Sequence, residues 1–261
     1  MTASRTDRTL DISFIDANKE SSVSGDCAPD ETLLDNPIWN SLLTDHRSIA
    51  VGDEHARRYP SEIGPLTGVP DQSPASYQAL HSLTGPGGVL ALFFQDPPSP
   101  SNGWKLLRGG QLSQMIWHGL NPNDIESPRM AGPAPKRLSP PDVPEMLALT
   151  KLTDPGPFRK RTIELGNYYG IFEAGKLVAM AGERMSLSGF IEVSAVCTHP
   201  DVRGRGFARK VILTVMRDIR RRGRTPFLHV LSENRSAIRL YESLGFEQRR
   251  TLHLAVLKNK R

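Results

Sequence analysis

The turn Arg203-Gly204-Arg205-Gly206-Phe207-Ala208 has residue types and spacing that suit the binding of an anion. It follows Phe190 to Thr198, which is apolar enough to be a buried strand, and it opens into an amphipathic helix predicted for residues 206–222. The first turn of a helix carries unpaired N–H groups and a partly positive dipole end, and glycines let a ligand approach the backbone. We therefore expect a cradle for an anion, above all a pyrophosphate.

The spacing of the glycines excludes two common nucleotide loops. Position 209 is Arg, where the dinucleotide fingerprint Gly-x-Gly-x-x-Gly needs its third glycine. The Gly-Lys-Ser/Thr end of a P-loop is also absent. The side chains of Arg203, Arg205 and Arg209 add positive charge, so the turn predicts some other pyrophosphate-bearing ligand.

Two stretches of the chain resemble the two signatures of the GNAT N-acetyltransferase superfamily. Residues 196–209 (VCTHPDVRGRGFAR) resemble its acyl-CoA signature, Arg/Gln-x-x-Gly-x-Gly/Ala between a strand and a helix. Residues 234–247 (NRSAIRLYESLGFE) resemble the second signature, Asn-x-x-Ala-x-x-Leu-Tyr-x-x-x-Gly-Phe. The resemblance covers residues 138–257 and is nearest to the C-terminal domain of glycine N-acyltransferase-like proteins. It implies acetyl-CoA or another acyl-CoA as co-substrate.

The resemblance also implies which residues hold the cofactor. The pantetheine arm would pair with the backbone of Val196 and Thr198 where two strands separate, and the pyrophosphate would meet the amides of residues 203–209. The alternatives are a plain turn for the two glycines and a helix N-cap for Asn234. The side chain of Cys197 is expected to pack in a core. The complete assignment is Val196, Cys197, Thr198, Arg203, Gly204, Arg205, Gly206, Phe207, Ala208, Arg209, Asn234 and Ala237.

The resemblance makes Tyr241 the general acid for the departing thiolate. Tyr241 lies two helical turns after Asn234, and its alternative role is packing in the core. Glu192 on the predicted central strand is the candidate proton acceptor, with Glu183 and His229 as weaker candidates. The alternative is that the alternation of side chains along the strand simply points Glu192 toward solvent. No metal-ligand spacing and no Ser/His/Asp or Cys/His arrangement is present, so neither a metal nor an acyl-enzyme is expected.

The elements that must position these residues alternate along the chain. From Leu138 the pattern predicts the order β-α-α-β-β-β-α-β-α-β, with a second helix over residues 158–165. The fold class is therefore α/β, a GNAT-like mixed sheet with flanking helices in the C-terminal half.

The N-terminal half is predicted to be a smaller α/β domain. The expected division is a disordered tail (1–30), this domain (31–120), a Pro-rich linker (121–136) and the acyltransferase domain (137–261). Strands predicted at residues 88–95 and 111–117 raise the hypothesis of a degenerate second GNAT-like copy without a cofactor motif.

The positive charge of the chain is concentrated near its C-terminus. Residues 201–261 hold 16 Lys and Arg against 5 Asp and Glu, and a basic face implies an anionic partner. Arg220-Arg221-Arg222 ends a helix, where cations are favoured, so we expect it to be a solvated surface. No nucleic-acid motif and no apolar run of about 18 residues is present, so neither nucleic acid nor a membrane is an expected partner.

The expected function is transfer of an acetyl or other short acyl group to a primary amine by direct attack in a ternary complex. A non-catalytic acyl-CoA-binding regulatory or interaction module is the alternative. The acceptor is expected to be a small-molecule or amino-acid amine rather than a protein. Cys27 and Cys197 lie far apart in unlike contexts, which favours a reducing compartment and a cytoplasmic location.

Overall fold

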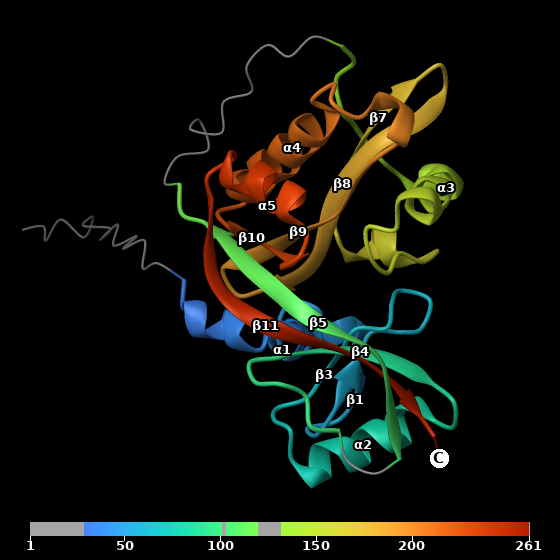
Figure 1. Cartoon of the computed structure of the whole chain (residues 1–261), viewed down its shortest axis with the longest axis vertical. Helices are drawn as coiled ribbons and strands as arrows, with labels where there is room; N and C mark the ends of the chain where they lie inside the picture. Colours follow the sequence, from blue (N-terminus) through green and yellow to red (C-terminus); the bar gives the residue numbers. More distant parts are fainter. Residues whose placement is uncertain (1–28, 101–102, 120–131, 261) are drawn as a thin grey trace, which may run out of the picture.

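Eight strands form one mixed sheet, in the spatial order β4-β11-β5-β10-β9-β8-β7-β6 (Figure 1). The computed structural model describes residues 29–100, 103–119 and 132–260. The strands of the sheet are β4 (Val89–Phe94), β5 (Trp104–Trp117), β6 (Lys136–Arg137), β7 (Tyr168–Glu173), β8 (Lys176–Leu187), β9 (Phe190–Thr198), β10 (Thr225–Leu231) and β11 (Phe246–Asn259). Three short strands, β1 (Val51–Gly52), β2 (Arg57–Arg58) and β3 (Thr67–Gly68), pair in a second sheet.

Helices cover both faces of the large sheet. α4 and α5 share a hydrophobic core with Ile191 and Val193 of β9, whereas α1 packs with Phe190 and α3 with Cys197 on the opposite face. α2 packs at the β4 end of the sheet. The helices are α1 (Pro37–Leu43), α2 (Pro74–Thr84), α3 (Val143–Thr153), α4 (Phe207–Arg221) and α5 (Arg235–Glu242), with 3-10 turns η1 (Glu31–Asp35), η2 (Arg47–Ile49), η4 (Pro140–Asp142), η5 (Thr162–Leu165) and η6 (Pro200–Val202).

The sequence of α4 explains both its buried face and its end. Val211, Val215 and Ile219 recur at four-residue spacing and have no exposed surface. Gly223 follows the helix with φ of 70°, a left-handed conformation that glycine adopts without a Cβ clash. This helix confirms the prediction for residues 206–222 within one residue at each end.

β5 joins the N-terminal part of the chain to the C-terminal part. It lies between β10 and β11 and pairs antiparallel with both, so that Ile116 lies opposite Phe227 and Trp117 opposite Phe246. β4 also pairs with β11. The predicted domain boundary at residues 121–136 therefore does not separate two sheets, because strands from both sides of it belong to one sheet.

The other predicted elements are present in part. The helix expected over residues 158–165 is wrong, because only the 3-10 turn η5 forms there. The strand predicted at residues 111–117 and the last strand of the predicted order are present, and each extends to 14 residues. Residues 1–28 and 120–131 lie outside the described residues, so the predictions of a tail and a linker fall mainly there.

Candidate active site

The parallel strands β9 and β10 pair over only three positions. The last pair joins Glu192 to Phe227. Beyond it, in the part of the chain that the structure describes, β9 continues to Thr198 paired with β8 alone, and β10 continues to Leu231 paired with β5 alone. The two strands therefore enclose a gap that opens toward their C-terminal ends.

Backbone groups of β9 face this gap. The N–H of His199 donates to the carbonyl oxygen of Val178 on β8 at 2.7 Å. Successive residues of a strand turn their backbone groups to opposite sides. The N–H and C=O groups of Thr198 and Val196 must then point away from β8, into the gap, as the assignment of the pantetheine arm requires.

A β-bulge at Ala195 changes which side chains face each core. Ala195 has a φ of 51°, and the pairing with β8 shifts between Met180 and Gly182. Val196 packs against the α4 core, while Cys197 is buried in the α3 core. Burial raises the pKa of the Cys197 thiol to about 12, so it stays protonated at neutral pH. Its predicted packing role is confirmed.

The glycine turn leads directly into the N-terminus of α4. Gly204 and Gly206 have φ of 77° and 78°, and Gly206 is the N-cap of the helix. A Cβ on Gly204 would meet no atom within 4 Å, so its conformation, not lack of space, requires glycine. The N–H groups of residues 207–209 have no partner within the helix and are available to an anion.

The arginines of the turn differ in their contacts. Arg205 donates two hydrogen bonds to the Glu173 carboxylate, at 2.6 and 2.8 Å, and its guanidinium lies 4.6 Å from the centre of the Phe207 ring. Arg203 is exposed, and its side chain forms no hydrogen bond or ion pair with the described residues. Arg203 is thus the cation of the turn most directly available to a ligand.

α5 carries the second predicted group of residues. The Asn234 side chain accepts a hydrogen bond from the N–H of Ala237 at 3.1 Å, so Asn234 caps the helix as its alternative role required. Arg209 donates to the carbonyl and hydroxyl oxygens of Ser243, at 3.3 and 3.2 Å. These last contacts hold the start of α4 against the end of α5.

Tyr241 lies in the core between α4 and α5. Its ring meets that of Phe246 edge-on, with the centroids 6.1 Å apart. Burial raises the pKa of Tyr241 to about 12, so the phenol is protonated at neutral pH and can act only as a proton donor there. The packing role and the donor role of Tyr241 are therefore compatible.

Thr198 provides a test of whether the gap suits a ligand. Its hydroxyl oxygen is buried and has no hydrogen-bond partner among the described residues. Buried polar atoms almost always have partners, so this orphaned hydroxyl indicates a missing one. Together with the free backbone edge of Val196 and the turn at Gly204, it fits the polar arm and the phosphates of a coenzyme A.

Glu192 has fixed partners at the closed end of the gap. Arg184 of β8 binds its carboxylate through two hydrogen bonds, at 2.5 and 2.7 Å, and His229 of β10 lies 2.8 Å away through Nδ1. Burial alone would raise the pKa of Glu192, but the charge of Arg184 and the hydrogen bonds lower that pKa to about 2. The carboxylate is therefore a weak proton acceptor, contrary to the role expected for it.

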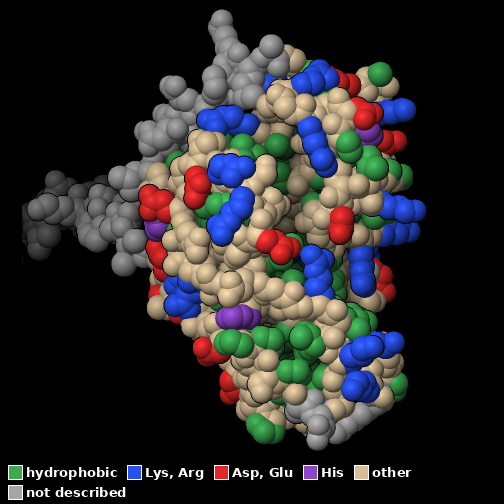
Figure 2. Space-filling model, viewed as in Figure 1, with side chains coloured by type: hydrophobic (Ala, Val, Ile, Leu, Met, Phe, Trp, Pro, Cys, Tyr) green, Lys and Arg blue, Asp and Glu red, His purple; other side chains and the backbone are tan. Residues whose placement is uncertain are grey.

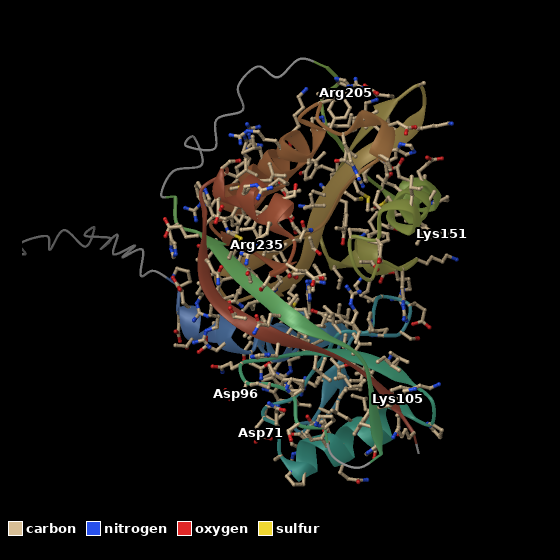
Figure 3. The ribbon with its side chains drawn as sticks, in the orientation of Figure 1. Asp71, Asp96, Lys105, Lys151, Arg205 and Arg235 are labelled. Carbon is tan, nitrogen blue, oxygen red and sulfur yellow. The ribbon has the colours of Figure 1, made fainter. Side chains whose placement is uncertain are left out.

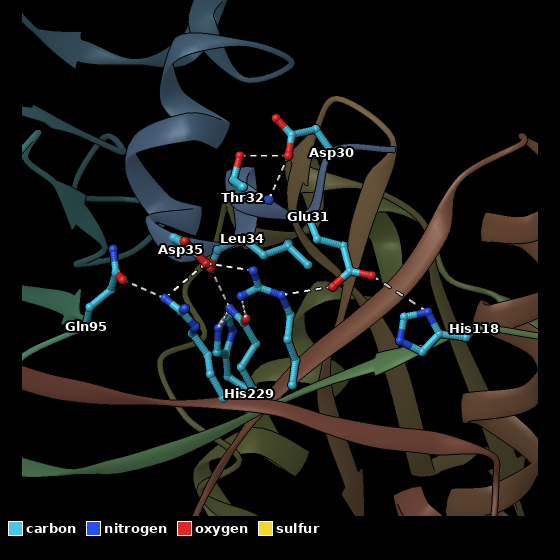
Figure 4. A network of polar contacts seen from close by, with 11 residues as sticks. Asp30, Glu31, Thr32, Leu34, Asp35, Gln95, His118 and His229 are labelled. Carbon is cyan, nitrogen blue, oxygen red and sulfur yellow. Dashed lines mark hydrogen bonds and ion pairs between the residues drawn. The ribbon is translucent and has the colours of Figure 1, made fainter. Parts of the chain in front are cut away.

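This contact belongs to a polar ladder across five neighbouring strands. Gln114 of β5 contacts Nε2 of His229 at 3.0 Å, and Arg249 of β11 donates to Gln114 Oε1 at 2.9 Å. Arg249 also reaches Glu31 and Asp35 of η1, at 3.1 and 2.7 Å (Figure 4). The ladder, Arg249–Gln114–His229–Glu192–Arg184, holds η1 and the closed end of the gap together.

Three of the five members of this ladder, Arg249, Gln114 and Arg184, are not among the site residues that the sequence predicts. Gln114 is a polar residue in the apolar run of β5, and that is a local signal that its side chain needs a partner. In the structure it is fully buried. Glu183, a weaker candidate base, is buried and paired with Arg222. Burial raises the pKa of Glu183, although Arg222 opposes the shift. Arg222 is therefore not merely part of a solvated surface.

The described residues contain neither a metal-binding cluster nor a membrane-spanning helix. Within residues 29–100, 103–119 and 132–260, no group of three or more His, Cys, Asp and Glu side chains could hold a metal ion. No helix in the described segments is long and apolar enough to cross a membrane. Figure 2 shows Lys and Arg interspersed with Asp and Glu on the face viewed.

Comparisons with known proteins agree with the geometry of this site. A family model described as FR47-like protein matches residues 168–254, which include β9, the glycine turn and α5. A protein of known structure from Novosphingobium aromaticivorans, assigned to the GNAT family of acetyltransferases, is 38% identical, with a TM-score of 0.78 over 87% of this chain and 99% of that one. No curated protein matches the sequence.

A more distant structure shows the same fold. A GCN5-related N-acetyltransferase from Kribbella flavida is 16% identical, with a TM-score of 0.57 over 86% of this chain and 94% of that one. The identity and coverage of the Novosphingobium protein, together with the β9–β10 gap, define the class: the chain belongs to the GNAT family of acetyltransferases.

Proposed function

We propose that this protein transfers an acetyl or other short acyl group from acyl-CoA to a primary amine. The observation that carries the proposal is the gap between β9 and β10, which ends at the glycine turn and the N-terminus of α4. An extended amide-containing arm suits a free backbone edge, and a pyrophosphate suits a helix N-terminus. Membership of the GNAT family supports acyl transfer from CoA in general.

In the proposed reaction both substrates are bound together. The neutral amine nitrogen attacks the thioester carbonyl carbon, a C–N bond forms, the C–S bond breaks, and the sulfur leaves as a thiolate. The Tyr241 phenol donates its proton to the sulfur and regains one from the amine nitrogen, so one proton moves from nitrogen to sulfur. The raised pKa of about 12 keeps the phenol protonated for this step.

We propose a positioning role for Glu192 in place of proton abstraction. Its carboxylate remains ionised because its pKa is about 2, and its oxygens are occupied by Arg184 and His229. It holds these two side chains where β9 and β10 separate. The acceptor must then bind as the neutral amine, without a carboxylate base to deprotonate it.

Because the Glu192 carboxylate is occupied by Arg184 and His229, a second candidate function is also favoured. A protein that binds acyl-CoA without catalysis would keep the gap and the glycine turn but would need no proton acceptor. The non-catalytic acyl-CoA-binding regulatory or interaction module is therefore retained as the alternative proposal.

A thiol-release assay with acetyl-CoA and a panel of amines tests the proposal. Tyr241→Phe should lower kcat about 100-fold or more with little change in CoA affinity, because a general acid contributes about 10²–10⁴-fold. Tyr77→Phe in α2, which removes the hydroxyl of another buried tyrosine, is the matched control and should keep activity. Equal turnover by wild type and Tyr241→Phe would refute the donor role. Stabilisation by CoA without turnover would favour the binding module.

We propose a small-molecule or amino-acid amine as the acceptor. The likeness to glycine N-acyltransferase-like proteins supports it. Neither nucleic acid nor a membrane is proposed as a partner. The buried thiol of Cys197 supports a cytoplasmic location.

A further inference from the structure

A pocket of about 360 Å³ lies beside the glycine turn, on the side away from α4. It is open to solvent on one side and is bounded by α3, by the hairpin of β7 and β8, and by the turn that follows β9. Its floor is apolar and includes Leu149, Leu177 and Val202, and Leu152 lies at its mouth, 54% exposed. The volume lies within the range of about 300–1,000 Å³ usual for small-molecule sites.

The polar groups of the pocket are mainly carboxylates. Glu145, Glu173 and Asp201 line it, against one lysine, Lys176, and one histidine, His199. The Glu145 side chain has a single contact among the described residues, a long one of 3.5 Å from the N–H of Leu177. An apolar floor with an excess of carboxylates suits a small cation with an apolar body.

Glu173 connects this pocket to the cofactor turn. Its carboxylate lines the pocket and also binds Arg205 of the turn, at 2.6 and 2.8 Å. Figure 3 shows Arg205 beside the hairpin of β7 and β8. The side chain of Arg205 is 49% exposed and that of Glu173 is 28% exposed, so water screens their attraction. The ion pair is therefore weak enough for Glu173 to exchange Arg205 for another cation.

We propose that the pocket binds a small apolar amine as an effector, and that this amine draws Glu173 away from Arg205. Arg205 is then free to contact the pyrophosphate of acyl-CoA at the neighbouring turn. The inference rests on the proposed function only in that acyl-CoA binds there. Linkage requires the two ligands to strengthen each other equally. An exposed ion pair of this kind corresponds to about a two- to fivefold change in affinity.

Calorimetry with CoA and phenethylamine tests the coupling without turnover. Phenethylamine should tighten CoA binding about two- to fivefold, whereas 2-phenylethanol, which has a similar apolar body and no charge, should not. Glu173→Gln should tighten CoA binding by a similar factor without the amine and abolish any further effect of it. Glu164→Gln, which breaks the exposed pair with Arg161, is the matched control and should leave both affinities unchanged.

Direct titration of phenethylamine distinguishes this pocket from the acceptor site. Glu145→Gln should lose amine binding and keep CoA binding, because Glu145 is exposed and has only the one weak contact. Undiminished amine binding by Glu145→Gln, or coupling that survives in Glu173→Gln, would overturn the inference. So would failure of the wild type to bind the amine. If the wild type binds the amine but not CoA, the pocket stands and the proposed function falls.

Discussion

Tyr241 and Glu192 are both buried, yet the phenol of Tyr241 is neutral at pH 7 and the carboxylate of Glu192 is charged. Tyr241 has apolar neighbours, so burial raises its pKa and the phenol stays neutral. Glu192 has a guanidinium and an imidazole within hydrogen-bond distance, and these outweigh burial. The neighbouring side chains, rather than the extent of burial, therefore make Tyr241 a proton donor and Glu192 a fixed anion.

Substitution of a single glycine should show whether the turn at Gly204 has a part in CoA binding that an ordinary turn glycine lacks. Gly204→Ala forces a side chain into a left-handed conformation, at a cost of about 1–2 kcal/mol. We expect it to weaken CoA binding at least tenfold, because the turn must shift to relieve the strain. Thermal unfolding and CoA titration measure the two effects separately.

Gly223→Ala is the matched control for that substitution. Gly223 also has a left-handed φ, of 70°, and open space at its Cβ position, but it lies at the other end of α4. It should lose a similar amount of stability and keep its CoA affinity. A parallel loss of CoA affinity in both variants would show that the turn at Gly204 has no special part in binding.

Among the elements, β9 and β10 create the candidate site where their pairing stops. Backbone hydrogen bonds between them end at Glu192 and Phe227. His229, two residues further along β10, bonds to the Glu192 side chain instead. Side chains thus hold the strands together at the point where their backbones separate, and the remaining backbone edge is free for a ligand.

The stability of this junction should depend on pH through Glu192. Its folded pKa of about 2 lies below the ordinary 4.5, so it stabilises the fold above pH 4.5, and that contribution is lost as the pH falls toward 2. Glu192→Gln should lower the free energy of unfolding at pH 7 by about 3 kcal/mol, and leave Arg184 buried without its partner.

Urea unfolding at pH 7 and at pH 3 measures this contribution. The difference between wild type and Glu192→Gln should shrink at the lower pH. Glu164→Gln, in the exposed pair with Arg161, should change stability by less than about 1 kcal/mol. A difference for Glu192→Gln that is the same at both pH values would contradict the lowered pKa.

At the scale of the whole molecule, one sheet is built from distant parts of the chain. β5 fills the space between β10 and β11 (Figure 1). Arg249 of β11 donates to Gln114 of β5, which lies 135 positions earlier in the chain. The core on the α1 face likewise combines Leu34 and Ile38 with Phe227 and Leu252. The two halves therefore share their hydrophobic core.

A fragment of residues 132–261 tests how far the C-terminal part is independent. Without β5 it would expose the edges of β10 and β11 and the apolar surface around Phe227 and Leu252. We expect no cooperative urea transition by circular dichroism and strong binding of a hydrophobic dye. A cooperative transition, with CoA affinity equal to that of the full chain, would instead support the separate domain that the sequence predicts.

The features that the sequence predicted well are local ones. The glycine turn, the limits of α4, the cap at Asn234 and the core position of Cys197 each depend on residues within a few positions along the chain. Phase and spacing are enough for these, because helices, turns and caps are stabilised by neighbouring backbone groups. The sequence pattern is therefore enough to predict an anion site at residues 203–209.

Only the tertiary structure decided how that site is enclosed. The insertion of β5 between β10 and β11, the contact of Glu192 with His229, and the contact of Arg205 with Glu173 join residues 32 to 135 positions apart. Local patterning cannot specify such pairs, because many strand orders bury the same apolar residues equally well. The turn is the proposed phosphate site, and the sheet around it determines which side chains remain free to act.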